Sequence, residues 1–161
     1  MQQSDVNRIL DAIEEESFLY PTFIASGHGT VADVLGGMEE VQTLLADKDT
    51  SLPIMRARYR EQDARMADGT RLTYFVFFGL ARDHQMIEDI ISHLKRYRGL
   101  PASTIMSPWH PFLHGAKALE LITGGQVKAP VRGGAGKQFD EFLTGVENWA
   151  KTHTDPPKPQ T

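Results

Sequence analysis

Residues 54–80 read IMRARYREQDARMADGTRLTYFVFFGL and lie in the middle of the chain. Over residues 54–60 apolar side chains alternate with arginines, and a period of two is typical of a strand with one solvated face. Asp68-Gly69 is a frequent hairpin turn. The apolar, aromatic-rich run over residues 72–80 favours a second strand buried on both faces, with a buried helix as the alternative. The stretch therefore predicts a β-hairpin.

The segments on both sides of this hairpin carry apolar residues three and four positions apart, which predicts amphipathic helices. The clearest helix runs from Asp83 to Arg98, with basic residues in its last turn and Gly99 directly after it. The other predicted helices cover residues 4–18, 30–45, 116–122 and 137–152. The expected fold class is therefore α+β, mainly helical with one central β-hairpin at about residues 54–80 and a C-terminal helical unit.

Composition suggests how this fold is organised and excludes several classes of protein. The 161 residues predict a helix and hairpin region over 1–100, a helical unit over 101–152 and a disordered tail over 153–161. A net charge of −4 argues against a dedicated nucleic-acid binder. The chain has no cysteine, so disulfides and thiolate sites are excluded. No run approaches the roughly 20 apolar residues of a membrane span, and no signal peptide is present, so we expect a cytoplasmic protein.

Three sequence patterns suggest chemistry, and each has a simpler structural interpretation. His110 and His114 are four residues apart, as in helical metal sites. However, Pro111 lies between them, and the glutamate of an HExxH motif is absent. Residues 132–137, RGGAGK, resemble part of a phosphate-binding loop without its first glycine and its hydroxyl residue. His28, with Asp33 nearby, fits either a catalytic triad or an ordinary turn. We therefore predict no metal ligands, no catalytic residues and no cofactor.

Two groups of residues are candidates for binding a partner. Arg56, Arg58 and Arg60 would share one face of the predicted strand and form a basic patch for phosphate or an acidic partner. The alternative is the solvated side of a half-buried strand, or charges that protect an exposed strand edge. Trp109 and Phe112 are large apolar side chains in a proline-bent turn, where they serve either as interface anchors or as core residues.

Residues 106–146 read MSPWHPFLHGAKALELITGGQVKAPVRGGAGKQFDEFLTGV. This segment contains a Ser-Pro turn, a Leu-x-Gly pair, a short leucine-rich helix, a Gly-Gly turn and a last amphipathic helix. These features are Ser107-Pro108, Leu113 with Gly115, residues 119–122, Gly124-Gly125, and the face formed by Phe139, Phe142, Leu143 and Val146. The segment resembles the C-terminal toxin-binding domain of Xre/MbcA/ParS-type antitoxins.

The resemblance implies a bacterial antitoxin-like protein that forms a homodimer and caps a partner toxin, often a RES-type enzyme that degrades NAD. It also implies DNA binding through an N-terminal helix-turn-helix. We therefore predict a non-enzymatic protein that neutralises or regulates its partner by steric occlusion. The predicted partner-binding residues are Trp109, Phe112, Leu113, Gly115, Leu119 and Leu121. The alternative is a small ligand-binding or metal-binding domain, or an enzyme, that uses His28, His84 or His110.

Overall fold

The central stretch of the chain, residues 54–80, is helical in the computed structural model, so the predicted β-hairpin is wrong. The structure describes residues 1–16, 39–97, 111–129 and 137–153. Within these ranges the chain is 86% helical and contains no strand. The described part of the fold is therefore all-α rather than α+β.

The first part of the stretch belongs to helix α5 (Lys48–Gln62). Its buried side chains include Leu52, Met55 and Tyr59, which follow spacings of three and four residues and so define one helical face. The alternation over residues 54–60 is too short to distinguish a strand from such a helix. Because each residue of a helix advances by about 100°, Arg58 lies on the opposite side of α5 from Arg56 and Arg60, which are four residues apart.

The second part of the stretch forms helix α6 (Asp68–Ala81), which follows the 3-10 turn η2 (Asp63–Arg65). Every side chain from Leu72 to Phe78 is at most 6% exposed. A helix that is apolar all round must be covered on all sides. The alternative interpretation of this run, a buried helix, is therefore correct, and Asp68-Gly69 begins that helix instead of forming a hairpin turn.

The other predicted helices are found close to their expected positions. The prediction for residues 137–152 is confirmed by α9 (Lys137–Thr152), and the first predicted helix corresponds to α1 (Gln3–Glu16). The predicted helix at 116–122 is the end of α8 (Pro111–Ile122). Helix α4 (Glu39–Ala46) covers the second part of the segment predicted at 30–45, and the rest of that segment lies outside the described residues, as does 154–161 of the predicted tail.

The helix predicted at residues 83–98 consists of three consecutive pieces: η3 (His84–Met86), α7 (Ile87–Leu94) and η4 (Lys95–Tyr97). Asp83 precedes them, and its carboxylate accepts a hydrogen bond from the backbone N–H of Gln85, as expected for a cap. The same carboxylate accepts two hydrogen bonds from Arg56 of α5, at 2.8 and 3.1 Å. Asp83 therefore both starts this segment and attaches it to α5.

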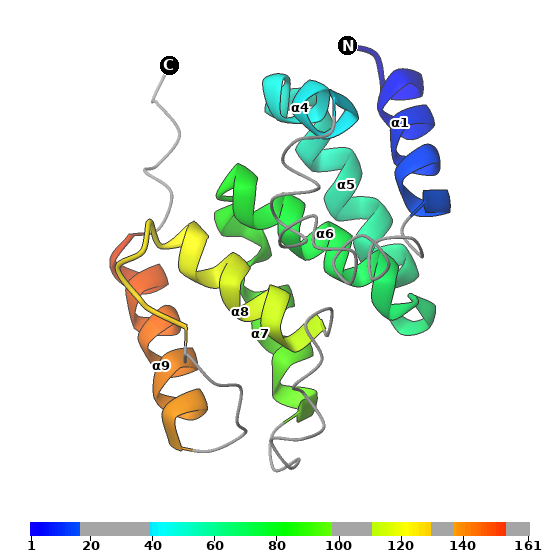
Figure 1. Cartoon of the computed structure of the whole chain (residues 1–161). Coiled ribbons are helices and arrows are strands. Elements are labelled where there is room, and N and C mark those ends of the chain that lie inside the picture. Colours follow the sequence, from blue (N-terminus) through cyan, green and yellow to red (C-terminus); the bar gives the residue numbers. More distant parts are fainter. Residues whose placement is uncertain (17–38, 98–110, 130–136, 154–161) are drawn as a thin grey trace.

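Helix α6 is the centre of the arrangement (Figure 1). Helices α1, α4 and α5 lie on one side of it, and α7, α8 and α9 lie on the other. The closest crossing joins α6 to α8, where a Cβ built on Gly79 would come within 2.8 Å of the Cα of Ala118. Glycine is therefore required at position 79 for the two backbones to approach this closely.

Among the described residues, no helix is both long and apolar enough to span a membrane.

Candidate functional site

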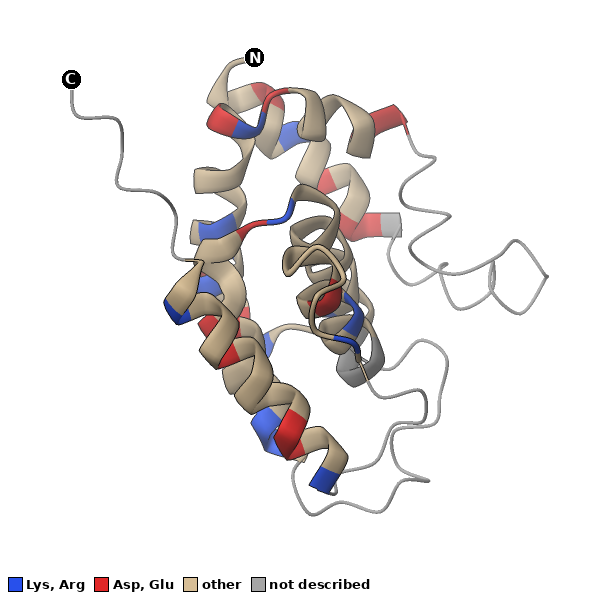
Figure 2. Cartoon of the chain, turned by 90° about the vertical axis from the view of Figure 1, so that its left-hand side faces the viewer, with Lys and Arg blue, Asp and Glu red and all other residues tan. Residues whose placement is uncertain are grey.

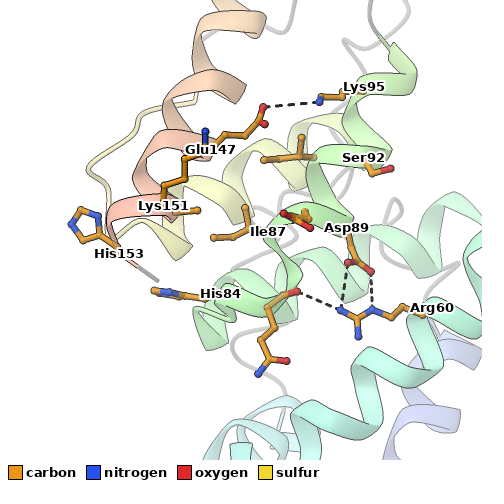
Figure 3. A pocket seen from close by; sticks show the side chains of 13 residues that line it. Arg60, His84, Ile87, Asp89, Ser92, Lys95, Glu147, Lys151 and His153 are labelled. Atoms are coloured by element: carbon orange, nitrogen blue, oxygen red, sulfur yellow. Dashed lines mark hydrogen bonds and ion pairs between the residues drawn. The ribbon is translucent and has the colours of Figure 1, made fainter. Parts of the chain in front are cut away.

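A groove of about 680 Å³ lies between α7 and α9 (Figure 3). Its first wall is η3, α7 and Lys95, and its second wall is the last part of α9 with His153 just after it. Arg60 of α5 lines the groove beside the first wall. The groove thus brings together three segments that are far apart in the sequence.

The two walls arise from helical spacing. On the first wall, His84, Glu88, Ser92 and Lys95 recur at three or four residues and so share one side of the segment. On α9, Glu147 and Lys151 are four residues apart and share a side in the same way. The apolar part of the lining is made by Ile87, Ile91 and Ala150.

The isoleucines of this lining are almost fully buried, each 4% exposed, so they belong to the core and show only an edge to the groove. Ala150 is half-buried. The base of the groove is therefore aliphatic, and its rim is polar. Ten of the thirteen lining residues are polar, charged or histidine, so the groove is mainly polar with a small aliphatic base.

Ion pairs connect the groove to its surroundings. The guanidinium of Arg60 donates to both carboxylate oxygens of Asp89, at 2.9 and 3.4 Å, and to the carbonyl oxygen of Gln85 at 3.4 Å. The hydrogen bond to Asp89 raises the pKa of Arg60 above its usual value, although partial burial acts in the opposite direction. At the other end of the groove, Lys95 Nζ lies 4.0 Å from Glu147 and links α7 to α9. These four charges already have partners within the chain.

Two further charges in the lining have no such partner. Glu88 on α7 and Lys151 on α9 are exposed and form no ion pair within the described part of the chain. Ser92, one turn after Glu88, likewise has no hydrogen-bond partner there. Each wall of the groove therefore presents one uncompensated charge, and the two charges are opposite in sign.

Aromatic rings close the end of the groove opposite the Lys95–Glu147 pair. The imidazole of His84 meets the indole of Trp149 edge-on at 5.0 Å, and the ring of His153 stacks on the same indole at 4.5 Å. The indole N–H of Trp149 donates to the side chain of Gln126 at 3.1 Å. Trp149 therefore holds both histidines at the groove's edge, where Figure 3 shows them together.

The charges around this side of the molecule are mixed. Three basic and three acidic residues line the groove, so it is formally neutral with neutral histidines. Figure 2 shows blue and red residues interspersed over the face that carries α9, with no extended region of one sign. A strongly acidic or strongly basic ligand therefore finds no matching field here.

The predicted basic patch does not form a patch in the structure, because its three arginines point to three different partners. Arg56 pairs with Asp83, and Arg60 pairs with Asp89. Arg58 turns to the other side of α5, where it pairs with Asp11 and Glu14 of α1 at 2.8 and 2.6 Å. The three residues connect helices to each other, and Arg60 alone of the three lines the groove.

The predicted partner-binding residues lie outside the groove wherever the structure describes them. Leu119 is fully buried, and a Cβ on Gly115 would come within 2.8 Å of Leu94 Cδ2, so both positions belong to the packing around α8. Leu121 is half-buried on the same helix. Trp109 and the side chains of Phe112 and Leu113 lie outside the described residues.

Of the predicted histidines, His84 lines the groove. His114 is half-buried in α8, whereas His28 and His110 lie outside the described residues, as does the loop before Lys137. Lys137 is exposed in the first turn of α9, 3.9 Å from Glu141. In the described ranges, no group of three or more His, Asp or Glu side chains is placed to hold a metal ion.

Sequence reasoning missed Glu88, Ser92 and Lys151. The signal that could have found them is the polar spacing on the exposed sides of the two helices. That spacing is also typical of any solvated helix face, so it does not reveal that the two faces meet.

No family model, no curated protein and no solved structure matches the chain. The resemblance of residues 106–146 to an antitoxin domain therefore stays a prediction.

Proposed function

We propose that the chain is a non-enzymatic, antitoxin-like binding protein that regulates or neutralises a partner protein by covering part of its surface. A segment of the partner would lie in the α7–α9 groove. The second wall of this groove, α9, begins within the segment that resembles the antitoxin domain. The residues of α9 that line the groove, Glu147, Ala150 and Lys151, directly follow that segment in the chain.

The observation that carries the proposal is the composition of the groove. Its base is aliphatic, its rim carries both signs of charge, and four of its six charges are held by partners in the chain. Polar rims around an apolar centre are typical of protein interfaces. Among the side chains that the structure describes, which exclude those of residues 111–113, Met1 is the only large exposed apolar one, and this fits a partner that dissociates rather than a permanent subunit.

The test is quantitative capture of a partner from a lysate of the source organism, using the tagged chain and two variants. Ala150→Trp fills the base of the groove, and Ala12→Trp adds the same side chain to an exposed position on α1. We expect the wild type and Ala12→Trp to capture one stoichiometric protein. We expect Ala150→Trp to capture at least roughly tenfold less while keeping its circular dichroism and melting temperature.

The captured protein then gives the functional readout. Its expression alone should slow growth of the host, and co-expression of the wild-type chain should relieve this effect. Co-expression of Ala150→Trp should relieve it less. Capture that is equal for all three chains, or the absence of any stoichiometric partner, would contradict the proposal.

A second candidate function is binding of a small molecule. The volume of about 680 Å³ lies within the range of roughly 300–1,000 Å³ that is usual for ligand sites, and His84 and His153 line its edge. Native mass spectrometry of the purified chain would reveal a bound compound. Loss of that compound in Ala150→Trp would favour this function over protein binding.

A further inference from the structure

We infer that the groove selects a polypeptide segment with one aliphatic side chain between a basic and an acidic side chain. The aliphatic group would lie on Ala150 and the edges of Ile87 and Ile91, the basic group would meet Glu88, and the acidic group would meet Lys151. This inference rests on the proposed function and specifies the chemistry of the partner.

Four of the six charges that line the groove are already paired within the chain. Arg60 is held by Asp89, and Lys95 is held by Glu147, so a ligand that engaged these groups would have to compete with contacts inside the chain. Glu88 and Lys151 face no such competition among the described residues. A ligand therefore meets two available charges, one of each sign.

The position of these two charges defines an order. Glu88 is three residues from Ile91, a spacing that places two side chains on the same side of a helix, and Lys151 lines the second wall together with Ala150. A segment crossing the groove from α7 to α9 would meet a carboxylate, then an apolar surface, then an ammonium group. The complementary ligand carries the opposite pattern of charges around an aliphatic centre.

This arrangement contributes to selection more than to tight binding. Exposed ion pairs are weak and screened by salt, whereas like charges placed opposite each other repel and exclude wrong partners. A segment with two acidic or two basic flanks would meet repulsion at one wall. Ser92, one turn from Glu88, adds a hydroxyl that can donate to or accept from the bound backbone.

The test is selection from a random linear peptide library displayed on phage, with the full chain immobilised. Glu88→Lys should shift the selected peptides toward acidic residues on both flanks, and Lys151→Glu should shift them toward basic residues on both flanks. Glu40→Lys on α4 and Arg65→Glu on η2 make the same changes in net charge at exposed positions outside the groove. These two control variants should select the same peptides as the wild type.

Affinity measurements complete the test. The dissociation constant of the best wild-type peptide should rise roughly threefold to tenfold for either groove variant, and the effect should shrink at high salt. Peptides lost on Ala150→Trp but unchanged by charge reversal would overturn the inference and leave the proposed function standing. Peptides that bind Ala150→Trp as well as they bind the wild type would overturn it too, because the groove would not be their site.

Discussion

Arg71 shows how a single residue organises the centre of the helical core. Arg71 is only 3% exposed. Its guanidinium donates hydrogen bonds to the hydroxyl of Tyr59 at 2.8 Å and to the carboxylate of Asp63 at 2.5 Å. It also donates to the backbone carbonyl of Asp63 at 2.6 Å. Burial raises the pKa of Tyr59 to about 12, against the opposing effect of the nearby Arg71. A buried charge of this kind is tolerated because it pairs with Asp63 and is hydrogen-bonded through both terminal nitrogens, although its Nε has no partner in the described part of the chain.

At the scale of this residue, we predict that Arg71→Met destabilises the fold by about 3 kcal/mol. The substitution leaves the Tyr59 hydroxyl and the Asp63 carboxylate without their main donor, and the partial exposure of Asp63 keeps the loss at the lower end of the usual range. Urea unfolding followed by circular dichroism measures it. Arg65→Met, at an exposed position on η2, is the control and should change the stability by less than about 0.5 kcal/mol. Equal stability of the two variants would show that Arg71 is not a structural anchor.

At the scale of the element, the crossing of α6 and α8 depends on small residues. Gly79 faces Ala118, and the next contact of an added Cβ would be the side chain of Leu121 at 3.2 Å. Gly115 of α8 lies against Leu94 and Phe75 in the same way. Small residues on both helices therefore set how near α8 comes to the aromatic face of α6.

We predict that Gly79→Ala destabilises the fold by about 1–3 kcal/mol, because the new methyl group would overlap the backbone of α8. Gly145→Ala on α9 is the matched control, since its nearest neighbour is a side-chain carbon of Val127 at 3.3 Å. Removing a helical glycine by itself stabilises by roughly 0.5–1 kcal/mol, so Gly145→Ala should be neutral or stabilising. Thermal unfolding of the two variants compares them directly. A stabilising Gly79→Ala would disprove the close crossing.

At the scale of the whole molecule, ion pairs connect helices that are distant in sequence. Arg58 links α5 to α1, where Glu14 also accepts a hydrogen bond from the Tyr74 hydroxyl at 2.5 Å. Asp63 pairs with Arg71 and lies 3.7 Å from Arg96. Burial raises the pKa of Asp63, but the hydrogen bond and charge of Arg71 outweigh it, so the pKa lies below its usual value of 3.8. Burial also raises the pKa of Glu120, but the hydrogen bond and charge of Lys117 help to bring that pKa below its usual value.

These shifts predict acid sensitivity. A carboxyl group with a lower pKa in the folded state binds protons more weakly there than in the unfolded chain. Its contribution to stability is therefore complete above the unfolded value of 3.8 for Asp63 and is lost as the pH falls below that value. We expect the free energy of unfolding to fall as the pH drops through this range, measured by urea unfolding at a series of pH values. Asp63→Asn should reduce the slope, whereas Asp49→Asn, an exposed position on α5 with no ion pair among the described residues, should not.

The amino-acid sequence by itself determined the amphipathic helices. The apolar spacing of α9 and of the α7 segment follows a helical period, because one side of each helix is buried and the other is solvated. The start of the α7 segment at Asp83 is likewise predicted from the sequence, since capping by an aspartate is local chemistry. Local patterns of this kind require no knowledge of distant contacts.

Only the tertiary structure decided the state of residues 54–80 and the position of the groove. The aromatic run of α6 is buried on every side, so its sequence has no polar face that could reveal a helical period. The arginines of α5 look like one face of a strand until their carboxylate partners on other helices are known. Glu88 and Lys151 lie far apart in the chain and become one site because α7 and α9 face each other across the groove. Such contacts depend on how the helices pack, and no short stretch of sequence contains that information.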